Sequence, residues 1–405
     1  MHYSFPRISH IDDIEGFRSQ GLIHEAFRNW TRDNGTIVYD YNYMGNDVFP
    51  PIGANDFARF ARELRGITFD ARTGALLSRP YQKFFNAGER EECLEARINL
   101  ADEHVVLEKL DGSMIHAFIE PAGQLAFATR SGVTWHARSA LQWFAGQDDN
   151  GSARAEVAAL CRAGFTPIFE WLSPDSVVVV QHQAHSLVLT AIRSRLDGSY
   201  VPAAALPEHA TRFGIPAIVA MDPIEAWASF AAAARAERSG EGYVVRFASG
   251  YMLKVKNELY SKIHALKALL TKEKDAFAIA LGNDLDDLLP HMTEAERAKV
   301  IDFREALLRR VQDLARRIDM AVETASKAIA TDDPRERPKR FWLDHAQPLG
   351  SDLAGLAVQV WNGKAIAFDA VRDLIIKATN SGPRAEGLAE RLELPRWAFT
   401  FEADG

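Results

Sequence analysis

The spacing of apolar residues changes near residue 260, and this change most constrains how the chain can fold. Before it, short alternating or β-branched runs predict strands. Glu241–Phe247 and Tyr251–Lys256, for example, flank Ala248-Ser-Gly250 as the arms of a hairpin. After it, apolar residues step by three or four from Val300 to Ile329, as on one face of a long helix. The pattern predicts an α+β domain over residues 1–260 and a mostly helical domain over residues 261–405.

Other segments of the first domain carry weaker signals. Strand composition recurs at Thr36–Tyr43, Ile67–Asp70, Ala75–Leu77, Val105–Leu107, Met114–Ile119, Pro167–Leu172, Val177–Val180 and Leu187–Arg193. Helices are expected between the strands at Asn55–Leu64, Ala137–Ala145 and Pro223–Glu237. Asp222 is the expected N-cap of the last helix, with Glu225 completing a capping box. Thr293 and Glu296 form the same pattern ahead of the long helix in the second domain.

Composition narrows the class of protein. The 405 residues include 47 basic and 55 acidic ones, a net charge of −8, so contact with nucleic acid would need a local basic patch. The two cysteines, Cys93 and Cys161, exclude a disulfide framework and a cysteine-rich zinc site. No signal-peptide pattern opens the sequence, and two histidines and two glutamines interrupt the apolar run Ser176–Ile192. We expect a soluble, monomeric protein without membrane contact, located in the cytoplasm or, if viral, in that of the infected host.

The segment Glu108-Lys-Leu-Asp-Gly-Ser113 is the most informative for chemistry. Lys109 stands at the end of an apolar run and before a turn, where its amine can face a pocket. Lysine attacks as a nucleophile only when it is neutral, so its surroundings must desolvate it or place positive charge beside it. Lys254 and Lys256 can supply that charge, because residues two apart on a strand share a face. A shared anion such as a phosphate would explain two adjacent cations.

The sequence contains its own control for this pattern. Arg195-Leu-Asp-Gly-Ser199 repeats the local string with arginine at the nucleophile position. Arginine stays charged and cannot attack, so this copy is interpreted as a turn. The short pattern alone is therefore weak, and an exposed hairpin lysine is its plain alternative.

The ordered set of motifs is more specific. Lys109-x-Asp-Gly112 is followed by Phe169-Glu-Trp171, then Glu241-Gly242, then Lys254-Val-Lys256. This order and spacing resemble the covalent nucleotidyltransferase superfamily of polynucleotide ligases and capping enzymes. Three upstream segments are similar to the bacteriophage RNA ligase 1 family, the tRNA-repair type: Tyr41-Asn-Tyr43, Leu64-Arg-Gly-Ile67 and Tyr81-Gln-Lys-Phe-Phe-Asn86. The resemblance covers residues 35–260 and beyond them rests on a helical C-terminal domain of similar size.

The resemblance implies an ATP-grasp-like ligase domain of antiparallel sheets with flanking helices, followed by an all-helical RNA-specificity domain. It also implies an ATP-dependent RNA ligase. Lys109 would attack the α-phosphate of ATP, AMP would pass to an RNA 5′-phosphate, and an RNA 3′-hydroxyl would displace it. Mg²⁺ or Mn²⁺ would assist these phosphoryl transfers. The partner would be RNA with such ends, with tRNA as one candidate.

Residue roles follow from the same resemblance. The catalytic residues would be Lys109, Lys254 and Lys256, the last two holding the α-phosphate. Arg65 and Lys83 would contact the tail phosphates of ATP, Phe85 would shape the nucleotide pocket, and Glu170 would meet the sugar. The remaining ATP-binding candidates are Asp111, Gly112, Arg130, Glu241 and Gly242, with Glu241 also near the metal. Arg130 stands where the family often has lysine.

Two alternatives to this function remain open. A DNA ligase or mRNA capping enzyme shares the motifs, but these usually place an OB-fold barrel after the paired lysines, and here the pattern turns helical. A non-catalytic RNA-binding protein on a ligase scaffold is the other. In the second domain, four basic residues beside Phe341-Trp342 suit an RNA backbone and a stacked base, or else a charged interhelical loop. They are Arg335, Arg337, Lys339 and Arg340.

Overall fold

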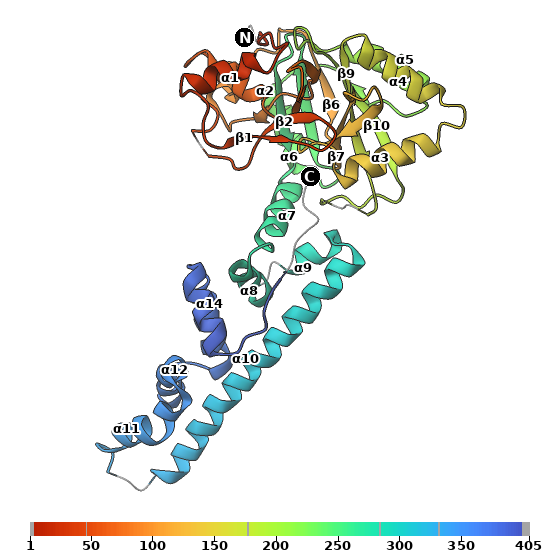
Figure 1. Cartoon of the computed structure of the whole chain (residues 1–405). Coiled ribbons are helices and arrows are strands. Elements are labelled where there is room, and N and C mark those ends of the chain that lie inside the picture. The colour runs from red at the N-terminus through yellow and green to blue at the C-terminus, as the bar shows by residue number, and fades with distance from the viewer. Residues whose placement is uncertain (1–3, 46, 176–177, 283–284, 331–332, 399–405) are drawn as a thin grey trace. The chain divides into compact units, whose positions relative to one another are not determined.

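The computed structural model describes residues 4–45, 47–175, 178–282, 285–330 and 333–398 (Figure 1). They divide into two compact units, with Met1–Lys262 in the first and Ile263–Phe401 in the second. Within the described residues, no helix is long and apolar enough to cross a lipid bilayer.

Three sheets build the first unit. One has the order β1-β2-β3-β4, the second β10-β9-β7-β8 and the third β11-β6-β12-β13-β5. Neighbouring strands within the described residues pair antiparallel, apart from the parallel pair of β13 and β5. The strands are β1 (Phe27–Thr31), β2 (Thr36–Tyr41), β3 (Ile67–Asp70), β4 (Leu76–Ser78), β5 (Phe85–Asn86), β6 (His104–Glu108), β7 (Ser113–Ile119), β8 (Leu125–Ala128), β9 (Phe165–Leu172), β10 (Ser186–Ser194), β11 (Ala220–Met221), β12 (Gly242–Phe247) and β13 (Met252–Lys256). The predicted α+β class with antiparallel sheets is confirmed.

Helices flank these sheets. α4 packs against β7 and β9, α5 against β10, and α6 against β12 and β13 (Figure 1). The helices are α1 (Asp12–Ser19), α2 (Phe57–Glu63), α3 (Trp135–Gly146), α4 (Ser152–Arg162), α5 (Leu206–Phe213), α6 (Trp227–Ala236) and α7 (Glu258–Leu269), the last of which continues into the second unit.

Strand β6 contributes to two hydrophobic cores. Successive side chains of a strand point to opposite faces, so Val106 enters the core that also contains Phe27, Phe69 and Val245. Leu107 enters the other core, formed by strands β7, β9 and β10 with helices α3 to α5. Because both faces of β6 are covered, the turn that follows it begins between the two cores.

Two local expectations are wrong. Within Val177–Val180, residues 178–180 form bends and no strand, because the amides of Val179 and Val180 donate to the Asp111 carboxylate. Residue 177 lies outside the described residues. The helix expected over Pro223–Glu237 begins only at Trp227, since the Ile224 amide donates to His104 Nε2 and the predicted cap does not form.

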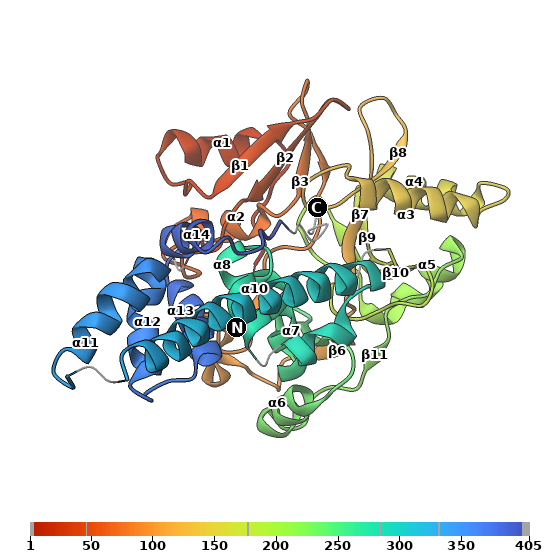
Figure 2. The same ribbon diagram turned by 90° about the horizontal axis from the view of Figure 1, so that it is seen from below.

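The second unit is helical throughout its described part. The long helix α10 begins after the predicted capping box of Thr293 and Glu296, and both hydrogen bonds of the box are present. α10 packs against α12 and α13, which lie beside it in Figure 2. The helices are α8 (Glu273–Leu281), α9 (Leu285–Leu288), α10 (Glu294–Ala328), α11 (Arg337–Arg340), α12 (Ser351–Trp361), α13 (Ala367–Ala378) and α14 (Gly382–Arg391).

A buried carboxylate ties elements of the first unit together. Glu63, at the end of α2, accepts hydrogen bonds of 2.8–3.1 Å from Arg79, after β4, and from Arg193 on β10. All three side chains are essentially inaccessible to solvent. Burial alone would raise the pKa of Glu63, but the two guanidinium groups hold it below its ordinary value. The carboxylate therefore stays charged and links α2 to two different sheets.

Replacing Glu63 by glutamine should destabilise the first unit by about 3–5 kcal/mol, because two guanidinium groups lose their buried counter-ion. Urea denaturation followed by circular dichroism measures this. Glu208→Gln is the matched control: Glu208 pairs with Arg212 on the exposed face of α5, and its loss should cost under about 1 kcal/mol. Equal losses in the two variants would contradict the expectation.

Candidate functional site

Lys109 lies where the chain passes from one sheet to another. β6 belongs to the sheet of β12 and β13, whereas β7 belongs to the sheet of β9, so Lys109–Gly112 is a crossing and not a hairpin turn. The Lys109 amide donates to the carbonyl of Gly242 at 2.8 Å, which fixes the lysine beside the start of β12.

Glu241 bridges two lysines at this point. Its Oε2 lies 2.5 Å from Lys109 Nζ and its Oε1 lies 2.8 Å from Lys256 Nζ. Although burial would raise the pKa of Glu241, the charges of Lys109 and Lys256 hold it below its ordinary value. A carboxylate that remains charged thus holds the Lys109 ammonium in place.

Lys254 and Lys256 share one face of β13, as the strand period predicts. Burial lowers the pKa of the Lys254 ammonium well below its ordinary value, and the charges of Lys83, Lys109 and Lys256 lower it further. A bound anion would stabilise the charged form of Lys254 against burial and the neighbouring cations.

The glycine of Glu241-Gly242 is required by strand pairing. Its φ is +131°, and a Cβ there would stand 2.1 Å from the carbonyl oxygen of Val255. Gly112 is similar, because a Cβ would stand 2.4 Å from the carbonyl oxygen of Trp171. Both glycines therefore allow two backbone segments to approach each other closely.

Arg65, Lys83 and Arg130 gather around Tyr41. The ring of Tyr41 lies 5.5 Å from Lys83 Nζ and 5.2 Å from the guanidinium carbon of Arg130. Burial would raise the pKa of Tyr41, but Arg65, Lys83 and Arg130 lower it. Arg65 and Lys83 also act on Lys254, so this group and the Lys109 group form one cationic site.

Glu170 on β9 faces the same site. Burial raises its pKa to about 8, opposed by Lys109 and reinforced by Glu241 and Asp111. Its electrostatic partners thus include the nucleophile candidate and two other carboxylates of the sequence-predicted set. A carboxyl group with this pKa is largely protonated at neutral pH and can donate a hydrogen bond.

The Asp111 side chain is engaged within the protein. Its Oδ2 accepts the amides of Val179 and Val180 at 2.8 and 2.6 Å, and its Oδ1 accepts the Tyr260 hydroxyl at 2.6 Å. Its backbone carbonyl contacts His182 Nε2 at 2.6 Å. Asp111 therefore fastens the loop after β9 and the first turn of α7 to the Lys109 crossing.

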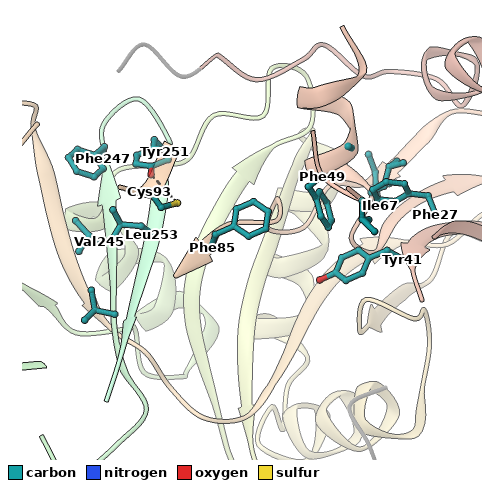
Figure 3. Packing of buried hydrophobic residues seen from close by; sticks show 14 of the residues in the cluster. Phe27, Tyr41, Phe49, Ile67, Phe85, Cys93, Val245, Phe247, Tyr251 and Leu253 are labelled. Atoms are coloured by element: carbon teal, nitrogen blue, oxygen red, sulfur yellow. Dashed lines mark hydrogen bonds between the residues drawn. The ribbon is translucent and has the colours of Figure 1, made fainter. Parts of the chain in front are cut away.

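Phe85 lies in the hydrophobic core. Only 1% of its surface is exposed, and Figure 3 shows its ring between the group of Phe49 and Tyr41 and the residues of β12 and β13. Lys83 Nζ stands 5.2 Å from the ring centroid. The face of an aromatic ring attracts a cation, so the Phe85 ring can hold the Lys83 ammonium group in position.

The structure brings most of the predicted site residues together in the first unit. The four basic candidates of the second domain belong to the second unit, where Arg337 donates to the Ala330 carbonyl and Arg340 pairs with Asp344. Sequence reasoning missed Asp40 and Tyr260 as parts of the site. Neither carried a local signal, because the contact of Tyr260 with Asp111 joins residues 149 apart and Asp40 lies in an ordinary strand pattern.

No cluster of three or more metal-binding side chains occurs among the residues that the structure describes. Glu241, the predicted metal contact, already pairs with two ammonium groups. The site therefore fits a metal that takes most of its ligands from substrate phosphates, as Mg²⁺ commonly does.

Comparisons with known proteins agree with the motif order. Residues 63–260 match the family model described as RNA ligase. A protein of Thermovibrio ammonificans, whose own assignment as an RNA ligase is provisional, is 30% identical over 171 residues, covering 39% of this chain and 44% of the relative. RNA ligase 1 of bacteriophage TS2126 is 31% identical over 171 residues, covering 41% of each chain. The chain spans less than half the length of these curated relatives.

Solved structures resemble the chain only loosely. An archaeal ATP-dependent RNA ligase has a TM-score of 0.43 at 14% identity, covering 73% of this chain and 78% of that chain. A Naegleria gruberi RNA ligase variant with ATP and Mn has a TM-score of 0.32 at 14% identity, covering 40% of this chain and 52% of that chain. Overlaps this loose carry no argument about function. Residues 63–260 are thus similar to the RNA ligase family.

Replacing Asp111 by alanine should expose the amides of Val179 and Val180 to exchange. Each loses a hydrogen bond to a carboxylate, which corresponds to about ten- to a hundredfold faster local exchange. Hydrogen–deuterium exchange of peptides spanning these residues measures this. Asp175→Ala is the control, because Asp175 is exposed on the same loop. Unchanged protection in Asp111→Ala would refute the fastening role.

Glu170 should make the first unit less stable as the pH rises. Its pKa of about 8 in the folded protein exceeds the ordinary 4.5, so the folded state holds a proton that the unfolded chain has released. Stability is therefore lost as the pH rises from about 4.5 through 8. In thermal melts at pH 6 and 8.5, wild type should lose more stability than Glu170→Gln. Parallel pH curves for the two proteins would contradict this.

Proposed function

We propose that the chain is an ATP-dependent RNA ligase that joins RNA 5′-phosphate and 3′-hydroxyl ends through lysyl-AMP and RNA-adenylate intermediates, in RNA repair with tRNA as one candidate substrate. The observation that carries the proposal is the Glu241 bridge between Lys109 and Lys256, inside a cluster of further cations. The family match of residues 63–260 supports the same chemistry. Residues 1–260 would form the adenylyltransferase domain and residues 261–405 the RNA-specificity domain.

In the first step, Lys109 Nζ forms a bond to the α-phosphorus of ATP while the bond to the bridging oxygen of pyrophosphate breaks. Lys254 and Lys256 hold the α-phosphate and stabilise the charge that develops on its oxygens. Arg65, Lys83 and Arg130 hold the departing pyrophosphate. Glu170 binds the sugar through its carboxyl group.

Lys109 must release its proton before it attacks. Lys109 Nζ forms an ion pair with Glu241 Oε2 at 2.5 Å, and Glu241 also pairs with Lys256. Attack requires Lys109 to leave this pair, and other positive charge beside Glu241 can take its place. Mg²⁺ or Mn²⁺ held by Glu241 and the substrate phosphates would supply that charge and neutralise the phosphate oxygens.

The later steps reuse the same cations. The AMP group passes from Lys109 to the oxygen of an RNA 5′-phosphate, and the Lys109 amine leaves. The RNA 3′-hydroxyl then attacks that phosphate, and AMP leaves. Asp111 acts here as a positioning residue, because its oxygens are taken by the protein. Arg335, Arg337, Lys339 and Arg340 are the proposed RNA contacts of the second unit.

Lys109→Ala should abolish covalent labelling by ATP that carries a labelled α-phosphate, because it removes the amine that Glu241 contacts at the end of β6. It should still join pre-adenylated RNA to a reduced extent, since that reaction bypasses the lysyl intermediate. Labelling is read by denaturing gel electrophoresis. Joining is read on the same kind of gel by the lengthening of the pre-adenylated RNA, with 5′-phosphorylated RNA as a second substrate for wild type.

The second copy of the motif provides a matched control. Arg195 donates to the carbonyls of Leu77 and Cys161 and lies in a turn. Arg195→Lys in the Lys109→Ala background recreates the sequence Lys-Leu-Asp-Gly-Ser away from the cluster of cations. This double variant should take up no label. A wild type that joins no 5′-phosphorylated RNA end would remove the ligase assignment, and a preference for GTP would favour a capping enzyme.

A further inference from the structure

We propose that Asp40 is a positioning residue that competes with pyrophosphate for Arg130 and so promotes release of this product. The proposal rests on the proposed function for its place in the reaction. It assigns a role to a carboxylate in the part of the site that would hold the departing phosphates.

Asp40 is a buried acid inside a basic cluster. Its side chain is 3% exposed, and its Oδ2 lies 3.4 Å from Arg130 Nε. Its other oxygen, Oδ1, is buried and accepts no hydrogen bond from the described residues. A carboxylate with one unsatisfied oxygen is costly, so this group contributes less to stability than an apolar residue of the same size would.

Three cations from three segments and one backbone amide surround Asp40. Arg130 follows β8, Arg65 follows α2, Lys83 precedes β5, and the Tyr41 backbone donates from β2 itself. Burial raises the pKa of Asp40 to about 6 against the charges of Arg130, Arg65 and Lys83. Near neutral pH the carboxylate is therefore mostly charged, while modest acidification protonates it.

The backbone at Arg130 is held tightly while its side chain reaches Asp40. A Cβ on Gly66 would stand 2.7 Å from Arg130 Cα, so the turn packs directly against the residue after Arg65. Thr129 and Gly132 close the same turn with backbone hydrogen bonds of 2.8 and 3.0 Å. The guanidinium group is thus the movable part, and it can face either Asp40 or a phosphate.

An anion bound by Arg65, Lys83 and Arg130 consequently meets an opposing charge. It must share Arg130 with Asp40, and it is repelled by the Asp40 carboxylate itself. Breaking the bond to the α-phosphate leaves a further charged oxygen on pyrophosphate, so the repulsion from Asp40 is stronger for the released product than for the tail of intact ATP. Asp40 therefore weakens product binding more than binding of intact ATP.

Binding of inorganic pyrophosphate to the whole protein tests the proposal by calorimetry. Asp40→Asn should bind it about tenfold more tightly than wild type at pH 7.5, the effect of a charge that shifts a pKa by one unit. The ratio of the two affinities should approach one at pH 5.5, where Asp40 of wild type is protonated. Taking the ratio cancels the titration of pyrophosphate itself.

Three further variants separate positioning from a structural effect. Asp33→Asn removes the same charge from an exposed position of the same hairpin and should leave the affinity unchanged. In an Arg130→Gln background, Asp40→Asn should have a smaller effect, because the two residues act through each other. Asp40→Glu keeps the negative charge and should bind pyrophosphate as weakly as wild type does. It provides a second test if Asp40→Asn does not fold.

Clear outcomes overturn the proposal. It fails if wild type and Asp40→Asn bind pyrophosphate equally at pH 7.5, if the ratio is the same at both pH values, or if neither protein binds pyrophosphate. Failure of the ligase assignment looks different, since wild type would then take up no label from ATP whatever its affinity for pyrophosphate. Where labelling does occur, added pyrophosphate should inhibit Asp40→Asn more strongly than wild type.

Discussion

The contact of one buried carboxylate with two ammonium groups supports the rest of the site. Glu241 stands just before β12 and reaches Lys109 from the end of β6 and Lys256 from the paired strand β13. Without that negative charge, Lys109 at the end of β6 and the two lysines of β13 would repel one another across β12. The register that sets Gly242 opposite Lys256 is therefore the condition under which Lys109 and the lysines of β13 can occupy one place.

The architecture explains why this contact occurs at the end of β6. Its two faces are buried in separate cores, and the chain then crosses into the neighbouring sheet. Lys109, the first residue of the crossing, lies just beyond β6, and its side chain reaches Glu241. Asp111 then secures the crossing by accepting three hydrogen bonds from two distant segments, which limits how far Lys109 can move.

Sequence patterns predicted the parts of this arrangement that depend on local periodicity. Lys254 and Lys256 share a face because a strand repeats every two residues, and α10 follows its apolar spacing and its capping box. Other features depend on contacts between distant residues. Val178–Val180 has strand composition, yet an aspartate 68 residues away takes the amide of Val179. Phe85 belongs to the right motif, but only tertiary packing reveals that its ring lies in the core.

Asp40 shows why the charges opposing a ligand are harder to predict than those attracting it. Cations of a phosphate site recur in motifs because each needs a set position relative to the phosphorus. A carboxylate that limits product affinity needs only to be close to one of them, and here it is an acid beside an aromatic residue in an ordinary strand pattern. Such a carboxylate is recognised from the structure instead. It is buried among cations without a full set of hydrogen bonds, which lowers the stability of the fold. A transferase that must release a highly charged product gains from such a group, because tighter binding of that product would slow every turnover.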